Sequence, residues 1–361
     1  MAKPGRARGM LVSARADLCQ LEGYHSPQIE VAVRLNTNES PYPPPERWRD
    51  ELLEALSSVQ LHRYPDRDAT ALREAIGDLH GVGPEQIFCA NGSNEVIQSL
   101  DLAYGGPGRS VALFEPTYAM HRHIAVNTSS AVATGRRQED FSLDLSEIAR
   151  VARESQPALT FLCSPNNPTG NADSLAEIQE AAAVVPGLLV VDEAYGQFAP
   201  RSALPLVAAG SPLVVLRTFS KTWALAGLRL GYLVGPAEVV KSLERVALPY
   251  HLDAVKQVAG KLALSYSAEM QERVSLIAEQ RDKLMAALDE LPVRYWHSDA
   301  NFILFRPERV EGHKVWEMLL DRSVLIRDCS SWPGLQGCLR VTVGTPDENS
   351  VFLNALEDCI L

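Results

Sequence analysis

The stretch from Arg217 to Tyr232, RTFSKTWALAGLRLGY, contains one lysine, Lys221, with no acidic residue near it. Ser220 precedes this lysine, and apolar and small residues follow it as far as Arg229. A lysine that reacts as an amine needs dry, cationic surroundings that lower its pKa, whereas a surface lysine needs no special environment. Lys221 is therefore a candidate reactive amine. Whether it is a reactive amine or an ordinary surface lysine depends on the residues in the rest of the chain.

A second candidate is Asp192, which directly follows the apolar run LLVV. Burying a carboxylate at the end of a strand is costly unless it meets a cation or hydrogen-bond donors. A phosphate-loop nucleotide site needs GxxxxGKS or GxxxxGKT, but the only Lys-Thr pair, Lys221-Thr222, has no glycine before it. No GxGxxG motif follows an expected strand either. We therefore expect Asp192 to face a different cation.

Pyridoxal phosphate supplies such a cation, because an acidic residue holds its protonated ring nitrogen and a lysine holds its aldehyde. In this interpretation Asp192 keeps the ring protonated, so that the ring withdraws electrons. Lys221 carries the cofactor and later moves protons. Ser220 and Arg229 flank the lysine and are suited to bind phosphate. Arg229 also adds a positive potential that favours the neutral form of the lysine.

Two further polar turns follow apolar runs. Gly92, Ser93 and Asn94 lie between QIFCA and an expected helix, where free backbone N–H groups suit an anion such as phosphate. Taken alone, this turn is better explained as an ordinary strand–helix turn with an Asn or Ser cap. The stretch SPNNPTG, which contains Asn167, is either a tight turn or part of a site.

These candidates follow short apolar runs that predict a largely parallel sheet. The runs are rich in β-branched residues and bounded by Gly, Pro or Asn, as in strands buried on both faces. Ligands of such sheets collect at the carboxyl ends of the strands. The runs are QIFCA, SVALFEP, ALTFLCSP, LLVVDEAY, LVVLRTFS and LRLGYLVG.

The pattern changes after residue 247. Residues 254–291 predict one or two long amphipathic helices. Next come the strand candidates ANFILFR, SVLIRDC and CLRVTVGT, with the helical stretch GHKVWEMLLDR between the first two. We therefore expect an α/β protein with an N-terminal arm (1–45), a large domain (46–247) and a small α+β domain (248–361).

The bulk composition limits the partners and the compartment. The 361 residues are 46% hydrophobic and 22% charged, as in ordinary globular proteins, and the formal net charge is −11. This charge disfavours nucleic acid and anionic membranes as general partners. No stretch approaches the roughly 18 apolar residues of a membrane span, and the basic start lacks the apolar segment of a secretory signal. None of the six cysteines forms a CxxC pair, so we expect reduced thiols and a cytoplasmic protein.

The segment SKTWALAGLRLGY, with an arginine eight positions after the lysine, resembles the cofactor-lysine motif of fold-type I aminotransferases. SPNNPTG and VVDEAY precede it in the order of that family. From about Asp17 to its end, the chain is similar more specifically to the histidinol-phosphate aminotransferases. That similarity is carried by RLNTNESPYPPP, HRYPDRDATALREAI, ANGSNEVI, FEPTYAMH, LPYHLDAVKQ, SDANFILFR and SVLIRDCSSWPGLQGCLRVTVGT. The resemblance implies fold-type I, with a seven-stranded, mostly parallel sheet in the large domain.

The resemblance also implies a role for each matching cofactor residue. Lys221 is the Schiff-base lysine and proton shuttle, Asp192 pairs with the pyridinium nitrogen, and Tyr118 stacks on the ring. Asn167 and Tyr195 hydrogen-bond the phenolic oxygen of the ring. The residues expected around the phosphate are Gly92, Ser93, Asn94, Thr218, Ser220 and Arg229.

Other implied roles concern the substrate and a partner subunit. Tyr64 of HRYPD reaches the cofactor phosphate of the partner, so the family pattern implies a homodimer with shared active sites. Arg327 and Arg340 bind the anionic groups of the substrates, and Tyr24 of the N-terminal arm closes over them. Tyr24 follows a glycine where the family commonly has Pro or Lys, and Arg327 has Asp328 as an alternative partner.

The activity implied by the resemblance is amino transfer between L-histidinol phosphate and 2-oxoglutarate, both small molecules, in histidine biosynthesis. An aromatic-amino-acid aminotransferase would share every cofactor residue. A decarboxylase of a phosphorylated amino acid and a non-catalytic cofactor-binding regulator are further alternatives. His62, His121 and His123 do not have metal-ligand spacing with cysteines. We expect these histidines at the surface or at edges, and we expect no metal.

Overall fold

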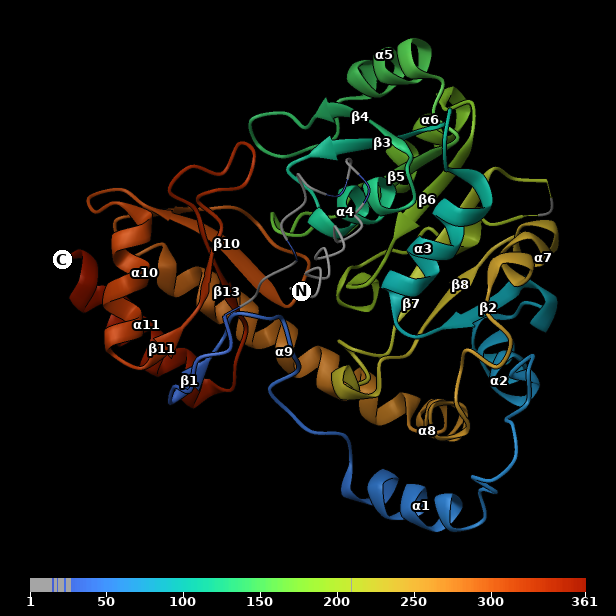
Figure 1. Cartoon of the computed structure of the whole chain (residues 1–361). Coiled ribbons are helices and arrows are strands. Elements are labelled where there is room, and N and C mark those ends of the chain that lie inside the picture. Colours follow the sequence, from blue (N-terminus) through green and yellow to red (C-terminus); the bar gives the residue numbers. More distant parts are fainter. Residues whose placement is uncertain (1–14, 16–17, 19–22, 24–26, 209) are drawn as a thin grey trace, which may run out of the picture.

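In a computed structural model of the chain, the described residues are 15, 18, 23, 27–208 and 210–361. They form sheets of seven, four and two strands with helices packed against them (Figure 1). Within this described part, no helix has the length and apolar character needed to cross a membrane.

The large sheet has six strands that run in one direction and one, β8, that runs against both of its neighbours. The order across the sheet is β2 (Ile87–Ala90), β8 (Gly231–Val234), β7 (Leu213–Thr218), β6 (Leu188–Asp192), β5 (Leu159–Cys163), β3 (Ser110–Glu115) and β4 (Ala131–Arg136). The predicted α/β architecture with a mostly parallel seven-stranded sheet is confirmed. Strand β4 was not predicted, because it is an edge strand with several exposed side chains rather than an apolar run.

Both faces of the large sheet are buried, as the apolar runs predicted. In β6, Leu188 and Val190 pack with one layer of helices, and Leu189 and Val191 pack with the opposite layer. Such strict alternation follows from the two-residue period of a strand. The first layer contains α3 (Ser93–Tyr104), α4 (Ala119–Asn127) and α7 (Ala237–Val246), and the second contains α5 (Leu145–Ser155) and α6 (Leu175–Val184).

The amphipathic segment after residue 253 forms two helices. The first, α8 (Ala254–Leu264), packs against α1 (Glu46–Ser57) and α2 (Thr70–His80) beside the β2–β8 end of the large sheet. The second, α9 (Ser267–Leu288), extends to the small sheet, where its last turns join the core. Helix α9 therefore links the two sheets in Figure 1.

The four-stranded sheet is antiparallel throughout. Its order is β12 (Arg327–Asp328), β13 (Leu339–Thr342), β10 (Phe302–Pro307) and β9 (Val293–Tyr295). Helices α10 (Gly312–Asp321) and α11 (Pro346–Ile360) cover one face, which buries Ile303, Phe305, Leu339 and Val341. The opposite face, which carries Leu304 and Arg340, is turned toward the large sheet.

The N-terminal segment reaches the small sheet through a two-stranded pairing. Strand β1 (Val33–Arg34) lies parallel to β11 (Val324–Leu325). Leu35 and Asn38 continue along the sheet, because Thr342 N–H donates to the Leu35 carbonyl at 2.9 Å and Asn301 Nδ2 donates to the Asn38 carbonyl at 3.2 Å. These contacts hold residues 37–39 between the two larger sheets.

Candidate active site

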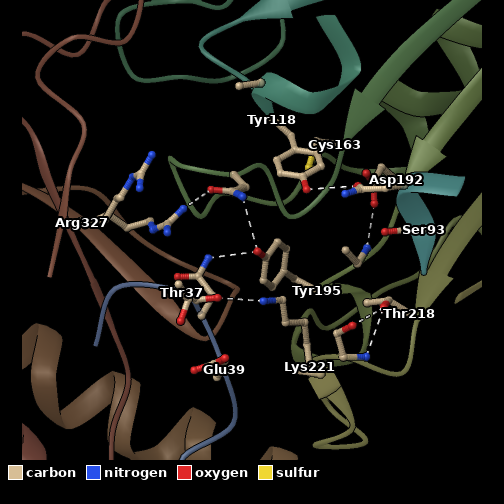
Figure 2. A pocket seen from close by; sticks show the side chains of 18 of the residues that line it. Thr37, Glu39, Ser93, Tyr118, Cys163, Asp192, Tyr195, Thr218, Lys221 and Arg327 are labelled. Carbon is tan, nitrogen blue, oxygen red and sulfur yellow. Dashed lines mark hydrogen bonds between the residues drawn. The ribbon is translucent and has the colours of Figure 1, made fainter. Parts of the chain in front are cut away.

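A cavity of about 320 Å³ lies between the carboxyl ends of the large-sheet strands, the four-stranded sheet and residues 37–39 (Figure 2). This is the place where ligands of parallel sheets collect. The predicted residues that line it are Ser93, Asn94, Tyr118, Asn167, Asp192, Tyr195, Thr218, Ser220, Lys221, Arg229, Arg327 and Arg340. Residues from opposite ends of the sequence thus share one cavity.

Lys221 lies just after β7 and is half-buried. Its Nζ donates a hydrogen bond to the Thr37 carbonyl at 2.9 Å and lies 5.7 Å from the centroid of the Tyr195 ring. Burial lowers the pKa of Lys221 to about 7, and the positive charges of Arg340 and Arg229 add to this effect. The dry, cationic surroundings that a reactive amine needs are therefore present.

Asp192 ends β6 and is 1% exposed. One carboxylate oxygen accepts the Ala194 N–H at 3.0 Å, and the other accepts Nε2 of His121 at 3.0 Å. His121 is fully buried and stacks on Phe161, with ring centroids 4.7 Å apart. The carboxylate therefore has donors, but no Lys or Arg pairs with it among the described residues.

The expectation that His121 lies at the surface or at an edge is wrong. In α4 the buried residues are His121, Ile124 and Ala125, which is the spacing of the inner face of a helix. That spacing was the sequence signal available for this residue. Of the other two histidines, His62 is exposed and His123 is half-buried.

Tyr195 and Asn167 form a hydrogen-bonded pair in the wall of the cavity. The Tyr195 hydroxyl accepts Nδ2 of Asn38 at 3.0 Å and Nδ2 of Asn167 at 3.4 Å. Burial raises the pKa of Tyr195, so the phenol stays protonated at neutral pH. Asn167 Oδ1 in turn accepts Nη1 of Arg340, so the pair connects to the small sheet.

The predicted phosphate residues converge on the start of α3. This helix begins at Ser93 after Gly92, which has a φ of +83°, and no side chain in the described part of the chain caps it. Arg229 lies against this turn and donates to Ser220 Oγ at 3.2 Å. Ser220 Oγ also accepts the Thr218 hydroxyl at 3.0 Å. A helix N-terminus beside a guanidinium and two hydroxyl groups is suited to an anion.

Arg327 and Arg340 face each other across β12 and β13 as directly paired residues. Arg340 is 5% exposed and donates Nη2 to the Asn36 carbonyl at 3.0 Å, while its buried Nε has no hydrogen-bond partner among the described atoms. Arg327 lies over the Trp332 ring at 5.5 Å from its centroid. Two arginines separated by thirteen sequence positions thus share one wall of the cavity.

Three predicted tyrosines differ in their placement. Tyr118 lines the cavity and donates its hydroxyl to Asn94 Oδ1 at 3.2 Å. Tyr64 lies away from the cavity, is 80% exposed and stacks on Tyr250 with centroids 4.4 Å apart. Tyr24 lies outside the described residues.

The structure adds cavity residues that were not singled out in the sequence. Thr37, Asn38 and Glu39 come from the N-terminal segment, and Trp332 comes from the loop before β13. None of these residues follows an apolar strand of the large sheet. The expectation that site residues lie at the carboxyl ends of such strands therefore could not identify them. The pairing of β1 with β11 and the hydrogen bonds from Thr342 and Asn301 bring residues 37–39 to Lys221.

The cavity wall is cationic although the whole chain is acidic. Lys221, Arg229, Arg327 and Arg340 line it against two carboxylates, those of Asp192 and Glu39. Such a wall attracts anionic small molecules. In the described part of the chain, no group of three or more His, Cys, Asp or Glu residues is placed to hold a metal ion.

Comparison with known proteins agrees with this geometry. Residues 30–356 match the class I and II aminotransferases, and the chain belongs to this family. It is 44% identical to the histidinol-phosphate aminotransferase of Frankia casuarinae, over 95% of this chain and 89% of that one.

Two solved structures show the fold. The chain matches the histidinol-phosphate aminotransferase of Sinorhizobium meliloti, solved with pyridoxal 5′-phosphate, with a TM-score of 0.88 and 21% identity, over 97% of this chain and 98% of that one. It also matches the L-threonine-O-3-phosphate decarboxylase of Porphyromonas gingivalis with a TM-score of 0.79 and 24% identity, over 90% and 98% of the two chains. The fold is therefore fold-type I, and the fold alone does not choose between amino transfer and decarboxylation.

Proposed function

We propose that this chain transfers an amino group between L-histidinol phosphate and 2-oxoglutarate with pyridoxal phosphate as cofactor, a step in histidine biosynthesis. The observation that carries the proposal is one cationic cavity that joins Lys221 and Asp192 to the paired Arg327 and Arg340. Family membership and a 44% identical relative named for this activity support it.

The residues present fit pyridoxal phosphate. Asp192 is a buried carboxylate that pairs with no Lys or Arg among the described residues, and it suits a protonated ring nitrogen. The start of α3, with Ser220 and Arg229, suits the phosphate. Tyr118 and Tyr195 offer a ring and a hydroxyl beside the same cavity. When bound, the cofactor supplies an electron sink for the substrate carbon that loses its proton.

Lys221 is proposed to hold the cofactor aldehyde and to move the substrate proton at Nζ. A pKa of about 7 leaves much of the amine neutral at neutral pH, and only a neutral amine accepts a proton. The hydrogen bond to the Thr37 carbonyl orients Nζ within the cavity.

Asp192, Tyr195 and Asn167 are proposed to set the charge on the ring. Asp192 holds the proton on the ring nitrogen, and His121 orients the carboxylate through the bond to Nε2. Tyr195 and Asn167, which hydrogen-bond each other, offer donors to the phenolic oxygen. A buried, preorganised set of donors acts strongly because water does not screen it.

Arg327 and Arg340 are proposed to bind the anionic ends of both substrates. Histidinol phosphate carries a phosphate ester and no α-carboxylate, whereas glutamate carries carboxylates. The planar fork of a guanidinium matches either anion, so one pair of arginines serves both half-reactions.

A homodimer and a cytoplasmic location complete the proposal. Tyr64 is 80% exposed and remote from the cavity of its own chain, which suits a side chain that reaches into the site of a partner. The five described cysteines Cys89, Cys163, Cys329, Cys338 and Cys359 are all free and buried, as expected in a reducing compartment.

A panel of amino donors with 2-oxoglutarate as acceptor tests the proposed substrate. We expect kcat/KM for histidinol phosphate to be well above that for phenylalanine, because the phosphate ester meets a cationic wall. Arg327→Ala should lower kcat/KM for histidinol phosphate, and Arg340→Ala should lower it for histidinol phosphate and glutamate alike. The loss of one charge-assisted contact in such a site is worth about 2–5 kcal/mol.

The exposed Arg201, which lies outside the cavity, provides the matched control. Arg201→Ala should leave both half-reactions unchanged. A panel in which phenylalanine is the better donor would instead assign the chain to aromatic-amino-acid amino transfer.

A further inference from the structure

A second cavity, of about 630 Å³, lies on the other side of the loop that bears Trp332. Strand β4 and helix α4 form one wall, and β9, β10 and the loop before β13 form the other. Trp332 lines the active-site cavity, whereas Pro333, Gly334 and Gln336 of the same loop line this second cavity. We call the second cavity the arginine groove, because Arg122, Arg136, Arg137, Arg294 and Arg306 line it.

The charges of the arginine groove are not balanced. Arg122 pairs with Glu115 at 3.4 Å, and Arg137 pairs with Asp173 at 2.9 Å. Among the described residues, no carboxylate forms an ion pair with the three remaining groups, Arg136, Arg294 and Arg306. Glu139 is the one described carboxylate of the groove that is not already paired.

Two of these arginines are placed against each other by the sheet itself. Arg306 of β10 and Arg294 of β9 are directly opposite residues of an antiparallel pair, so their side chains share one face. Like charges in this position destabilise a sheet. An arrangement that costs stability and lies in a cavity is a typical mark of a binding site.

The same face of the small sheet carries the arginine pair of the active site. Arg340 is opposite Leu304, and Arg306 lies two residues beyond Leu304 on β10, so both arginines are on that face. The sheet therefore presents Arg327 with Arg340 to one cavity and Arg294 with Arg306 to the other. The two edges of one sheet thus repeat the same arrangement of directly paired arginines.

Two nitrogen atoms of groove residues lack hydrogen-bond partners in the described part of the chain, and both are covered by protein atoms. Arg137 is 7% exposed, and its Nε has no hydrogen-bond partner among the described atoms. The same holds for the buried Nε1 of Trp296. Arg294 lies over the Trp296 ring at 5.0 Å from its centroid, and that ring packs against Phe141. The Trp296 ring therefore holds the Arg294 guanidinium at the groove through a cation–π contact.

We propose that the arginine groove is a second binding site, for a small polyanion with at least two phosphate or carboxylate groups. The guanidinium groups of Arg294 and Arg306 hold one anionic group, and Arg136 on the opposite wall holds another. The volume suits a ligand of that size. The site is separate from the cavity of the proposed reaction, because the loop before β13 divides the two.

The test is calorimetric titration of the cofactor-loaded protein with inorganic pyrophosphate and, separately, with citrate. The variant Arg136→Gln/Arg306→Gln removes two groove charges, and Arg153→Gln/Arg201→Gln removes two exposed charges outside the groove. We expect at least one probe to bind about tenfold or more weakly to the groove variant than to the wild type. The control variant should bind like the wild type.

Binding in the active-site cavity is distinguished by a third variant, Arg327→Gln. The groove signal should persist in this variant and disappear in the groove variant, which should keep its wild-type turnover of amino donors. Binding of pyrophosphate alone identifies a phosphate ligand, and binding of citrate alone identifies a carboxylate ligand. Equal isotherms for the groove variant and the wild type with both probes would refute the proposal.

Discussion

At the scale of single residues, the reactivity of Lys221 is set by side chains that are distant in the sequence. Burial lowers its pKa most, Arg340 and Arg229 lower it further, and Glu39 acts in the opposite direction. The Thr37 carbonyl accepts its hydrogen bond from 184 positions away. The folded cavity, rather than the adjacent residues in the sequence, therefore lowers the pKa of the Lys221 amine and orients it.

The lowered pKa of Lys221 predicts a pH-dependent stability of the cofactor-free protein. The folded chain releases this proton near pH 7, whereas the unfolded chain keeps it up to about 10.5. Between these values the unfolded state binds more protons, so stability rises with pH in this window. In urea unfolding, the cofactor-free Lys221→Met variant should exceed the wild type in stability by more at pH 6.5 than at pH 9. A difference that does not change with pH would contradict the lowered pKa.

Asp192 offers a second test at this scale. Asp192→Asn keeps the volume of the side chain and an acceptor for the Ala194 N–H, but it removes the charge. We expect the melting temperature to change by a few degrees at most and kcat to fall by about 10²–10³, the usual effect of losing an electrostatic stabiliser. Steady-state kinetics and thermal unfolding of the cofactor-loaded variant measure both. A kcat close to that of the wild type would make Asp192 a structural residue.

At the scale of elements, the start of α3 and strand β8 are packed too closely for any side chain between them. A Cβ on Gly231 would lie 2.4 Å from the Ser93 nitrogen, which is a backbone atom and cannot move aside as a flexible side chain can. Gly92, at the same turn, lies against Arg229. The proposed phosphate site thus depends on the contact between these two elements.

Gly231→Ala should therefore damage the proposed phosphate site as well as stability. Overpacking of this kind typically costs about 1–3 kcal/mol, and the shift of α3 should weaken pyridoxal phosphate binding. Gly187→Ala is the control, since a Cβ there would lie 2.3 Å from the Ala158 carbonyl oxygen, an equally tight backbone contact directly before β6 and outside the cavity. Thermal unfolding and cofactor titration compare the two variants. Equal cofactor affinity in both would mean that α3 does not hold the phosphate.

At the scale of the whole molecule, the candidate site exists only because two sheets and the N-terminal segment meet. The large sheet provides Asp192 and Lys221, and the small sheet provides Arg327 and Arg340 (Figure 2). Tyr64 is absent from this cavity and is exposed. If it acts in the site of a partner, each active site also depends on a second chain.

Subunit mixing tests this dependence. Lys221→Ala and Tyr64→Phe variants should each have low activity as separate homodimers. A mixed dimer has one site with an intact Lys221 and an intact Tyr64 from the other chain, so activity should rise above the sum of the separate variants after subunit exchange. Sedimentation should show dimers at the assay concentration. Activity that stays at the sum, or an active monomer, would exclude a shared site.

Local patterns were enough to predict six of the seven strands of the large sheet and the candidate residues Asp192 and Lys221. Asp192 and Lys221 follow apolar runs that form β6 and β7, and both strands are buried throughout. The physical reason is that strand length, β-branching and burial are local properties, and parallel strands place their carboxyl ends at one edge. The sequence patterns alone therefore predict that the side chains that follow such strands lie close together.

Only the tertiary structure decided which distant residues complete the site. His121 meets Asp192 from 71 positions away, and it was expected at a surface or an edge because no local motif marks that contact. The reversed direction of β8 and the two arginine pairs of the small sheet likewise depend on strand register. Strand register and helix packing depend on contacts between segments that are far apart in the sequence, and short-range sequence patterns do not encode those contacts.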